Sequence, residues 1–297
     1  MKASRREAIT GYIFAAPWLI GFCVFLLYPL LASLYYSFCD YSVLRPPIFI
    51  GPSNYVGLFK DEVFRITLWN TGFYAVLSLL FGLCFTLSLA LLLNAKVKGM
   101  TIYRTLFYIP SLVPAVSLAV LWLWVFNGEH GILNQVLKVP LSWVHLTPPN
   151  WLGDPLWSKP ALILMSVWGA GNTVVIYLAG LQDVPQPLYE AAELDGATWW
   201  QKTRNVTIPM LSPVIFFNFI MGIIGSIQVF TVPYVMFPQG SPSRSTYFLT
   251  MYLFDNAFIY HKMGYACAMG WIMFVIILAL TWLARTVSER HVYYEGG

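Results

Sequence analysis

The sequence carries little charge. Only 10% of its 297 residues are Asp, Glu, Lys or Arg, whereas a soluble domain carries about 25%. The net charge of +4 is spread along the chain, so nucleic acid is not predicted as a partner. Apolar residues make up 58% of the chain and collect in runs of about 20 or more, the length of a membrane-spanning helix. The composition therefore excludes an ordinary soluble domain and predicts an all-α integral membrane protein.

Cysteine and catalytic motifs are also scarce. The four cysteines lie mostly within apolar runs, without the spacing of metal ligands or of pairs, and are Cys23, Cys39, Cys84 and Cys267. The patterns G-x-x-x-x-G-K-[ST], H-E-x-x-H and G-x-S-x-G are absent from the sequence. We therefore predict no metal site, no catalytic residue and no cofactor in this chain. If ATP and Mg²⁺ are used, a partner chain binds them.

Six apolar runs predict six membrane-spanning helices in a single domain, residues 1–297. The runs cover residues 11–38, 69–95, 105–126, 161–182, 213–236 and 263–284. The first is longer than the apolar part of a secretory signal, about 7–15 residues, so we interpret it as a retained span. None of the six contains an ionisable Asp, Glu, Lys, Arg or His. A proton-coupled carrier or an intramembrane hydrolase needs such a group at depth, so both are disfavoured, while sodium coupling through carbonyls and hydroxyls stays open.

The distribution of basic residues predicts the orientation in the membrane. With the N-terminus in the cytoplasm, the inner segments hold ten of the 17 Lys and Arg residues, and the outer segments hold seven. The inner residues are Lys2, Arg5, Arg6, Lys96, Lys98, Arg104, Lys202, Arg204, Arg285 and Arg290. This bias favours cytoplasmic N- and C-termini, because basic loops are retained inside. The polar segment between the fourth and fifth spans then faces the cytoplasm.

That polar segment, residues 184–212, predicts two short helices. Pro187 suits the first turn of a helix over "PLYEAAELD", and Gly196 offers the left-handed residue that ends it. Thr198 and Gln201 have the spacing of a capping box, which predicts a second helix that stops before Pro209.

One side of the first helix predicts a contact surface. Leu188, Ala191, Ala192 and Asp195 share that side, and the small alanines leave room for another protein. Glu190 lies in the first turn, where the helix dipole favours a carboxylate. The alternative is a solvated loop whose acidic residues merely suit helix ends, which the joint spacing of E-A-A, D-G-A and I-P disfavours.

These residues resemble the EAA loop of the membrane subunits of binding-protein-dependent ABC importers. The pattern is met by Glu190, Ala191, Ala192, Asp195, Gly196, Ala197, Val206, Ile208, Pro209 and Pro213, while Thr203 stands where the family usually has Phe. The resemblance extends over nearly the whole chain. "NYVGLFKDEVFRITLWNTGFYAVLS", "YRTLFYIPSLVPAVSLAVLWLWVFNGEHGILN" and "VWGAGNTVVIYLAGLQDVPQPLYEAAELDGA" are similar to the carbohydrate-importer branch, including the maltose and glycerol-3-phosphate systems.

The resemblance implies a type I importer permease core in the bacterial inner membrane, with a first helix that wraps the partner. It implies a heterodimer with a second permease, two ATP-binding subunits inside, a solute-binding protein outside and a sugar as substrate. It further implies that the loop docks into the ATPase, with Glu190 as the charged anchor and Gly196 as the bend. The residues expected to couple to the ATPase are Glu190, Ala191, Ala192, Asp195, Gly196, Ala197, Ile208 and Pro209.

Polar groups and aromatic faces within the fourth and fifth spans are candidates for the sugar path. The fourth span offers Trp168, Gly169, Asn172 and Thr173, and the fifth offers Asn218, Gly225, Ser226, Gln228 and Thr231. Similarity to the maltose importer implies Trp168, Gly169, Asn172, Gly225, Ser226 and Gln228. The alternative is that these groups join and pack helices. Trp168 and Asn172 are four residues apart, which predicts that they face the same side of one helix.

Four functions compete on this sequence. A sugar-importer permease subunit accounts for the EAA loop, which a secondary carrier does not need. An integral-membrane enzyme lacks a catalytic cluster. An importer permease for a glycerol phosphate or a polyamine stays open, although the spans contain no group of Arg residues for an anionic solute.

Overall fold

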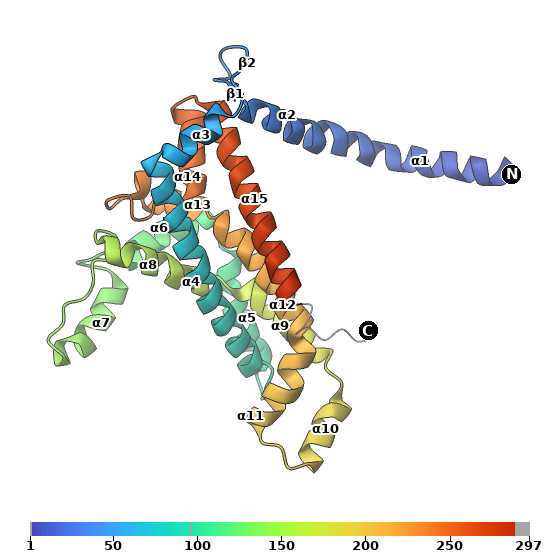
Figure 1. The fold of residues 1–297 in the computed structure, drawn as a ribbon. Helices are drawn as coiled ribbons and strands as arrows, with labels where there is room; N and C mark the ends of the chain where they lie inside the picture. The colour runs from blue at the N-terminus through green and yellow to red at the C-terminus, as the bar shows by residue number, and fades with distance from the viewer. Residues whose placement is uncertain (1, 96, 289–297) are drawn as a thin grey trace. The chain divides into compact units, whose positions relative to one another are not determined.

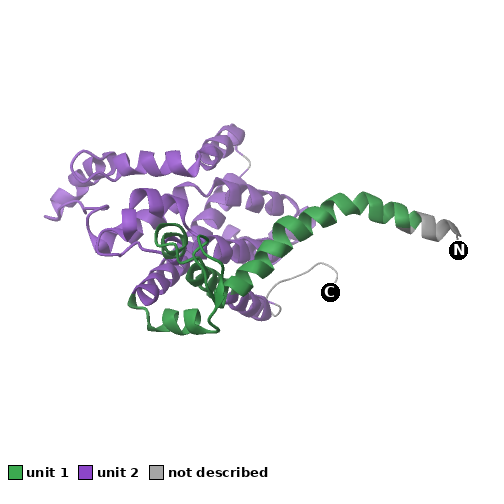
Figure 2. Cartoon of the chain, turned by 90° about the horizontal axis from the view of Figure 1, so that it is seen from above, with its two compact units in different colours: residues 1–62, 252–274 green, residues 63–251, 275–297 purple. Residues whose placement is uncertain are grey.

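The computed structural model describes residues 2–95 and 97–288. Two of the basic residues from which the orientation was predicted, Lys96 and Arg290, lie outside the described residues. The chain divides into two compact units, residues 1–62 with 252–274 and residues 63–251 with 275–297 (Figure 2). Each unit is described by itself. Three helices continue across the division, and these are α4 (Glu62–Leu93), α14 (Leu249–Phe254) and α15 (Met263–Ser288).

The first unit begins with a long helical stretch and a small hairpin (Figure 1). In chain order its elements are α1 (Lys2–Phe22), the π turn η1 (Cys23–Leu27), α2 (Tyr28–Ser37), β1 (Cys39–Asp40), β2 (Ile48–Phe49), α3 (Ser53–Lys60) and the π turn η5 (Asp255–Ile259). The two strands pair antiparallel, with Cys39 opposite Phe49. None of the most apolar 18 residues within Ile9–Ser37 is buried, so this span presents its surface to lipid or to another subunit.

A half-buried polar network joins distant parts of the first unit. Asp61, which follows α3, accepts hydrogen bonds from the hydroxyl groups of Tyr252 at 2.5 Å and Tyr265 at 2.9 Å. Burial and the bond to Asp61 raise the pKa of Tyr252 above its usual value. Gly264 lies so close to the hairpin that an added Cβ would be 2.1 Å from the carbonyl oxygen of Cys39. The hairpin, α3 and the start of α15 are therefore held as one piece.

The second unit is helical in the residues that the structure describes. Its elements after α4 are α5 (Met100–Tyr108), the 3₁₀ turn η2 (Ile109–Leu112), α6 (Ala115–Val125), α7 (Ile132–Trp143), α8 (Pro155–Trp168), α9 (Gly171–Gln182), α10 (Gln186–Leu194), α11 (Trp199–Lys202), the π turn η3 (Thr203–Thr207), α12 (Ile208–Ile227), α13 (Thr231–Met236) and the 3₁₀ turn η4 (Pro238–Gly240). Arg104 on α5 donates to the carbonyl oxygen of Leu93 from two nitrogens, at 3.1 and 3.0 Å. These bonds satisfy a carbonyl at the end of α4 that has no helical partner.

By length and composition, four helical stretches of the described chain can each cross a membrane, and two bent pairs raise the number to six. The four are Ile9–Ser37, Glu62–Leu93, Trp199–Met236 and Met263–Ser288. The third predicted span is bent by 100° between Met100–Leu112 and Ala115–Val125, and the fourth by 46° between Pro155–Trp168 and Gly171–Gln182. Both differ from the unbroken helices expected from apolar run length.

The two bends have local causes. Pro110 and Pro114 flank the first, and a proline interrupts the hydrogen bonding of a helix and restricts the residue before it. Gly169 and Gly171 flank the second. At Gly171 an added Cβ would lie 2.8 Å from the carbonyl oxygen of Phe107, so only glycine lets the start of α9 meet the end of α5.

A compact apolar core joins α4, α9 and α12. Its buried members are Ala90, Leu93, Val174, Tyr177, Leu178, Leu181 and Leu211. Gly180 permits the close approach of α9 and α12, because an added Cβ would lie 2.8 Å from side-chain atoms of both Leu211 and Val214. The two ends of the polar segment between these helices are thereby held together.

Candidate functional site

The first helix of the polar segment, α10, ends in a Schellman motif. The Gly196 amide donates to the carbonyl of Glu193 at 3.0 Å, and the Ala197 amide donates to that of Ala192 at 2.9 Å. Gly196 has a φ of +74°, the left-handed conformation expected of it. Ala192, Gly196 and Ala197 are therefore spaced as the Schellman motif at the end of a helix requires.

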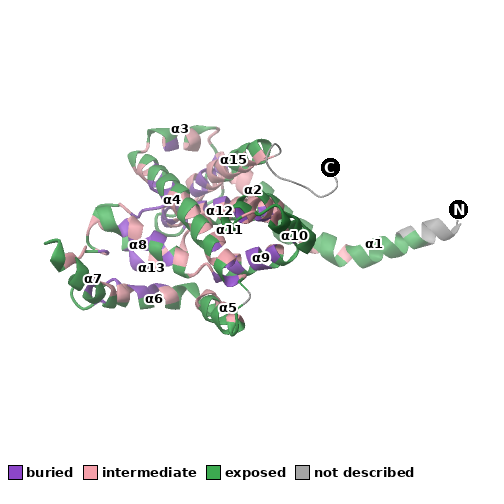
Figure 3. Cartoon of the chain, turned by 90° about the horizontal axis from the view of Figure 1, so that it is seen from below, coloured by how far each residue is buried: buried purple, intermediate pink, exposed green. Residues whose placement is uncertain are grey.

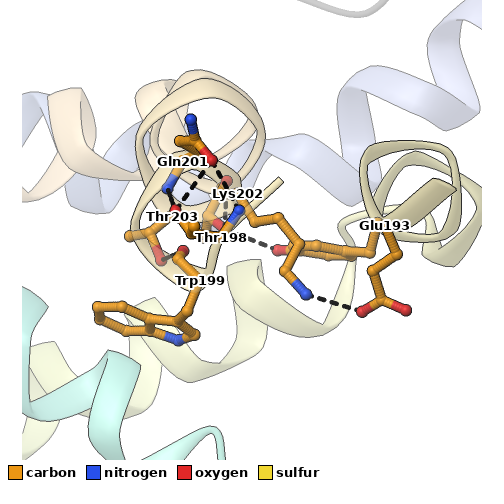
Figure 4. Close-up of polar contacts among 8 residues, drawn as sticks. Glu193, Thr198, Trp199, Gln201, Lys202 and Thr203 are labelled. Atoms are coloured by element: carbon orange, nitrogen blue, oxygen red, sulfur yellow. Dashed lines mark hydrogen bonds and ion pairs between the residues drawn. The ribbon is translucent and has the colours of Figure 1, made fainter. Parts of the chain in front are cut away.

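The second helix begins as predicted and ends differently. Thr198 and Gln201 form the capping box, with the Thr198 amide donating to Gln201 Oε1 at 2.7 Å (Figure 4). The prediction that this helix stops before Pro209 is wrong. The helix continues from Trp199 through Pro209 to Ile227, and η3 widens it by one residue directly before the proline. The Ile208 amide bonds to the carbonyl of Thr203, which shifts the hydrogen-bond register where Pro209 lacks a donor.

Two side-chain contacts join α10 to the start of the fifth span. Lys202 Nζ lies 2.7 Å from Glu193 Oε1 (Figure 4), and the hydroxyl groups of Tyr189 and Thr207 are 2.9 Å apart. The hydrogen bond and the charge of Lys202 lower the pKa of Glu193. None of these four residues was among the predicted site residues. The two pairs are nine and 18 positions apart in the sequence, and neither separation matches the period of a helix or of a strand, so nothing in the sequence indicated that they meet.

The outer surface of the segment is exposed. Glu190, Ala191, Asp195 and Gly196 are all exposed, and Ala192 is half-buried. Large apolar side chains are exposed beside them, namely Leu188, Leu194, Trp199 and Trp200, with Leu194 at 90%. Figure 3 shows α10 and α11 as mostly exposed helices. Several large apolar side chains exposed in one short segment indicate a protein contact. Of the other predicted coupling residues, Ala197 and Ile208 are half-buried and Pro209 is exposed.

Thr203, which stands where the family usually has Phe, is buried. Only 4% of the residue is exposed, and its hydroxyl donates to the carbonyl of Trp199 at 3.0 Å. This chain therefore lacks the apolar contact that a phenylalanine ring could make here. The Thr203 hydroxyl instead forms a hydrogen bond within its own helix.

A polar cavity of about 430 Å³ lies between α4, α8, α9 and α12. Four of the six predicted path residues line it, namely Gly169, Asn172, Gly225 and Ser226. Other polar lining residues are Thr173 and Asn218, which the sequence also offered as candidates, and Tyr74, Ser78, Thr86 and Ser166, which it did not. Tyr74, Ser78 and Thr86 lie on α4, whereas the prediction considered only the fourth and fifth spans.

Trp168 and Gln228 do not line this cavity. Trp168 borders a separate, mostly apolar cavity of about 420 Å³ and packs edge-on against Trp122, at 5.8 Å between ring centroids. Gln228 lies exposed after the last residue of α12. The prediction that Trp168 and Asn172 share a helix face is wrong, because the bend at Gly169 and Ala170 separates them.

The polar segment and the polar cavity are mechanically connected. The segment begins where α9 ends and is continuous with α12 at its other end, and both helices line the cavity. Gly180 holds the two helices together between the segment and the cavity. The segment therefore adjoins two walls of the cavity, through the short connection 183–185 on the side of α9 and through the π turn η3 on the side of α12.

Comparison with known proteins identifies the class. A family model described as "Binding-protein-dependent transport system inner membrane component" matches residues 82–292, and the chain belongs to this family. It is a multi-pass inner membrane protein and a transport subunit with the type I ABC importer permease fold.

Particular relatives share this organisation over nearly their whole length. The chain is 38% identical to the probable ABC transporter permease protein YesP of Bacillus subtilis strain 168, over 99% of this chain and 95% of YesP. It is 32% identical to the arabinooligosaccharides transport system permease protein AraP of the same organism, over 93% of this chain and 88% of AraP. The structure matches a chain of a bacterial ABC transporter for import of the acidic polysaccharide alginate, with a TM-score of 0.84, 27% identity and coverage of 97% and 98%. It also matches a chain of a bacterial alginate ABC transporter in complex with an alginate pentasaccharide-bound periplasmic protein, with a TM-score of 0.83, 26% identity and coverage of 97% and 96%.

Proposed function

We propose that this chain is one of two permease subunits of an ATP-driven importer for an uncharged sugar. The observation that carries the proposal is the continuity of the exposed α10–α11 segment with α9 and α12, two walls of the polar cavity. The ATPase contacts the segment, and the solute passes along the cavity. ATP and Mg²⁺ are bound by the ATPase, and this chain holds no cofactor of its own.

The coupling step follows from the exposed surface of the segment. Glu190 is the charged anchor, and Ala191 with Ala192 lets the ATPase surface approach closely. The segment can only drive a change of state if the ATPase binds it differently before and after ATP is bound. Helices α9 and α12 then move with the segment and open or close the cavity.

The lining of the cavity favours an uncharged solute. The residues that line it in the described chain include hydroxyl and amide side chains but no Asp, Glu, Lys, Arg or His. A phosphate or uronate would be left without a cation, and a polyamine without a carboxylate, at a high cost away from water. This supports a neutral mono-, di- or oligosaccharide over a glycerol phosphate, a polyamine or an acidic polysaccharide.

The partners are a second, different permease, two ATP-binding subunits inside and a solute-binding protein outside. The membership in a binding-protein-dependent family and the sugar-importing relatives support this assembly. The unburied surface of Ile9–Ser37 supports a contact with the second permease. Cytoplasmic N- and C-termini remain supported by the excess of Lys and Arg in the inner segments.

The test is ATP hydrolysis by the assembled complex in lipid vesicles. The chain is expressed with the permease, ATPase and binding-protein genes beside its own, and neutral sugars, a uronic-acid oligosaccharide, glycerol phosphate and a polyamine are supplied in turn. We expect one neutral sugar to stimulate hydrolysis, and only with the binding protein present. Stimulation by a charged solute alone would overturn the solute class. Ion-driven transport by the chain without an ATPase would overturn the whole proposal.

A further inference from the structure

Helix α7, in the connection between α6 and α8, carries an uncovered apolar stripe. Ile132, Val136, Val139 and Trp143 follow one another at steps of four, three and four residues, which places them on one side of a helix. Their exposed fractions are 47%, 65%, 60% and 78%. A stripe of four large apolar side chains exposed on one helix is unusual for a surface in contact with water.

The opposite side of α7 is fixed to the rest of the unit. Asn134 is buried and donates to the carbonyl oxygens of Gly128 at 3.0 Å and Pro149 at 3.1 Å. The indole N–H of Trp151 donates to Asn134 Oδ1 at 2.8 Å. These three bonds set the rotation of α7 about its axis, so the apolar stripe cannot turn inward.

The same residues hold α7 beside the end of the third span. The ring of Trp151 packs on Phe126, with 5.6 Å between centroids, and Phe126 directly follows the last residue of α6 and is fully buried. The turn between α6 and α7 is tight, since Asn127 Oδ1 accepts from the amides of Glu129 and His130 at 3.0 and 2.9 Å. At Gly131 an added Cβ would lie 2.3 Å from the carbonyl oxygen of Asn127. Helix α7 therefore begins a few residues after the end of α6, the second half of the third candidate span, and is held close to it.

We propose that α7 lies in the surface of the lipid bilayer, on the side where α6 ends, with its apolar stripe among the acyl chains. Interfacial helices combine an apolar face with a polar one that carries Lys or Arg, and their Trp side chains lie at the boundary. In α7, Gln135, Lys138 and Ser142 form the polar edge beside the stripe. Lys138 is the single charged residue between Ile132 and Trp143, so its cation complements anionic headgroups. The inference does not depend on the proposed transport activity.

Photo-crosslinking in the complete transporter identifies the occupant of the stripe directly. Val136→p-benzoylphenylalanine places the probe on the stripe, and Gln135→p-benzoylphenylalanine is the control on the polar edge of the same helix. The complexes are reconstituted in phosphatidylethanolamine and phosphatidylglycerol vesicles, irradiated and analysed by mass spectrometry. We expect lipid adducts to be several-fold more abundant at position 136 than at 135. Equal yields, or crosslinks from position 136 to the binding protein, to the second permease or to another copy of this chain, would overturn the proposal.

A second measurement applies if either photoprobe variant fails to assemble. Spin labels are attached at Val139→Cys and at Ser142→Cys, in a background without Cys23, Cys39, Cys84 and Cys267. The label at position 139 should collide more with oxygen, which concentrates in the acyl chains, and less with a water-soluble nickel complex than the label at 142. The same accessibility at both positions, or greater nickel accessibility at 139, would show that the stripe faces water or protein.

Discussion

At the scale of single residues, some residues of the polar segment shape its backbone, and others are exposed on its surface. Ala192, Gly196 and Ala197 occupy the positions whose amides and carbonyls close the end of α10. Gly196 needs its left-handed conformation. Glu190 and Ala191, by contrast, are exposed, so we expect them to contact a partner protein, as the proposed function requires.

Glu193 and Lys202 give a prediction on pH. Because Lys202 lowers the pKa of Glu193, the contact stabilises the segment above the ordinary Glu pKa and is lost as the pH falls through the lowered value. In Lys202→Met the pKa of Glu193 should rise toward its ordinary value. An NMR titration that follows the ¹³C chemical shift of the Glu193 carboxyl carbon measures this pKa. Lys138→Met is the control and should leave the Glu193 titration unchanged. A Glu193 pKa unaffected by Lys202→Met would show that the ion pair does not form.

Asn172 and Trp168 give a second prediction, because the bend places them in different surroundings. Asn172→Ala removes an amide from the polar cavity and should reduce sugar transport, while binding-protein affinity and complex stability stay unchanged. Trp168→Ala removes a ring packed on Trp122 and should lower thermal stability by a few kcal/mol or less, since aromatic pairs contribute about 0.5–1.5 kcal/mol beyond their buried area. Transport assays and thermal melts of both variants separate the two roles. Transport lost in Trp168→Ala alone, at wild-type stability, would contradict this assignment.

At the scale of helices, the apolar runs predicted which parts of the chain form long helices, and the capping residues predicted the ends of α10 and the start of α11. The bends were missed because run length reports apolar content and is insensitive to Pro110, Pro114 and the glycines near 170. The continuation through Pro209 was missed because a π turn changes the hydrogen-bond register without a distinct sequence signal. The cavity residues Tyr74 and Thr86 lie on α4, and their convergence with the fourth and fifth spans depends on packing that one sequence does not reveal. The ATPase-coupling role of the predicted loop residues stays a prediction.

Gly196→Ala tests the helix end in the coupling segment. An alanine at φ +74° costs about 1–2 kcal/mol, so the hinge between α10 and α11 should distort and binding-protein-stimulated ATP hydrolysis should fall. Gly72→Ala is the matched control, since a Cβ there meets no atom within 4 Å and Gly72 lies inside α4. It should leave hydrolysis unchanged. Similar losses in both variants would mean that any Gly to Ala change disturbs the complex, and would contradict the special role of Gly196.

At the scale of the whole molecule, the proposed function places the contact with the ATPase at the α10–α11 segment and the passage of the solute at the polar cavity. Helices α9 and α12 connect the two. The exposed segment offers no nucleotide site, and the cavity offers no charge. What connects them is the pair α9 and α12, held together at Gly180. We expect such a subunit to take its energy from a partner chain, as the proposed function requires, and membership in a binding-protein-dependent family supports this expectation.

The most direct test of the coupling role is to measure how the complex that carries Glu190→Ala assembles and how fast it hydrolyses ATP. Glu190 is exposed, so the variant should insert and melt like the wild type. We predict that less ATPase co-purifies with it and that stimulation by the binding protein with sugar is largely lost. Glu129→Ala, which removes an exposed carboxylate in the connection between α6 and α7, is the control and should assemble normally. Unchanged ATPase binding and unchanged transport in Glu190→Ala would contradict the coupling role of the segment.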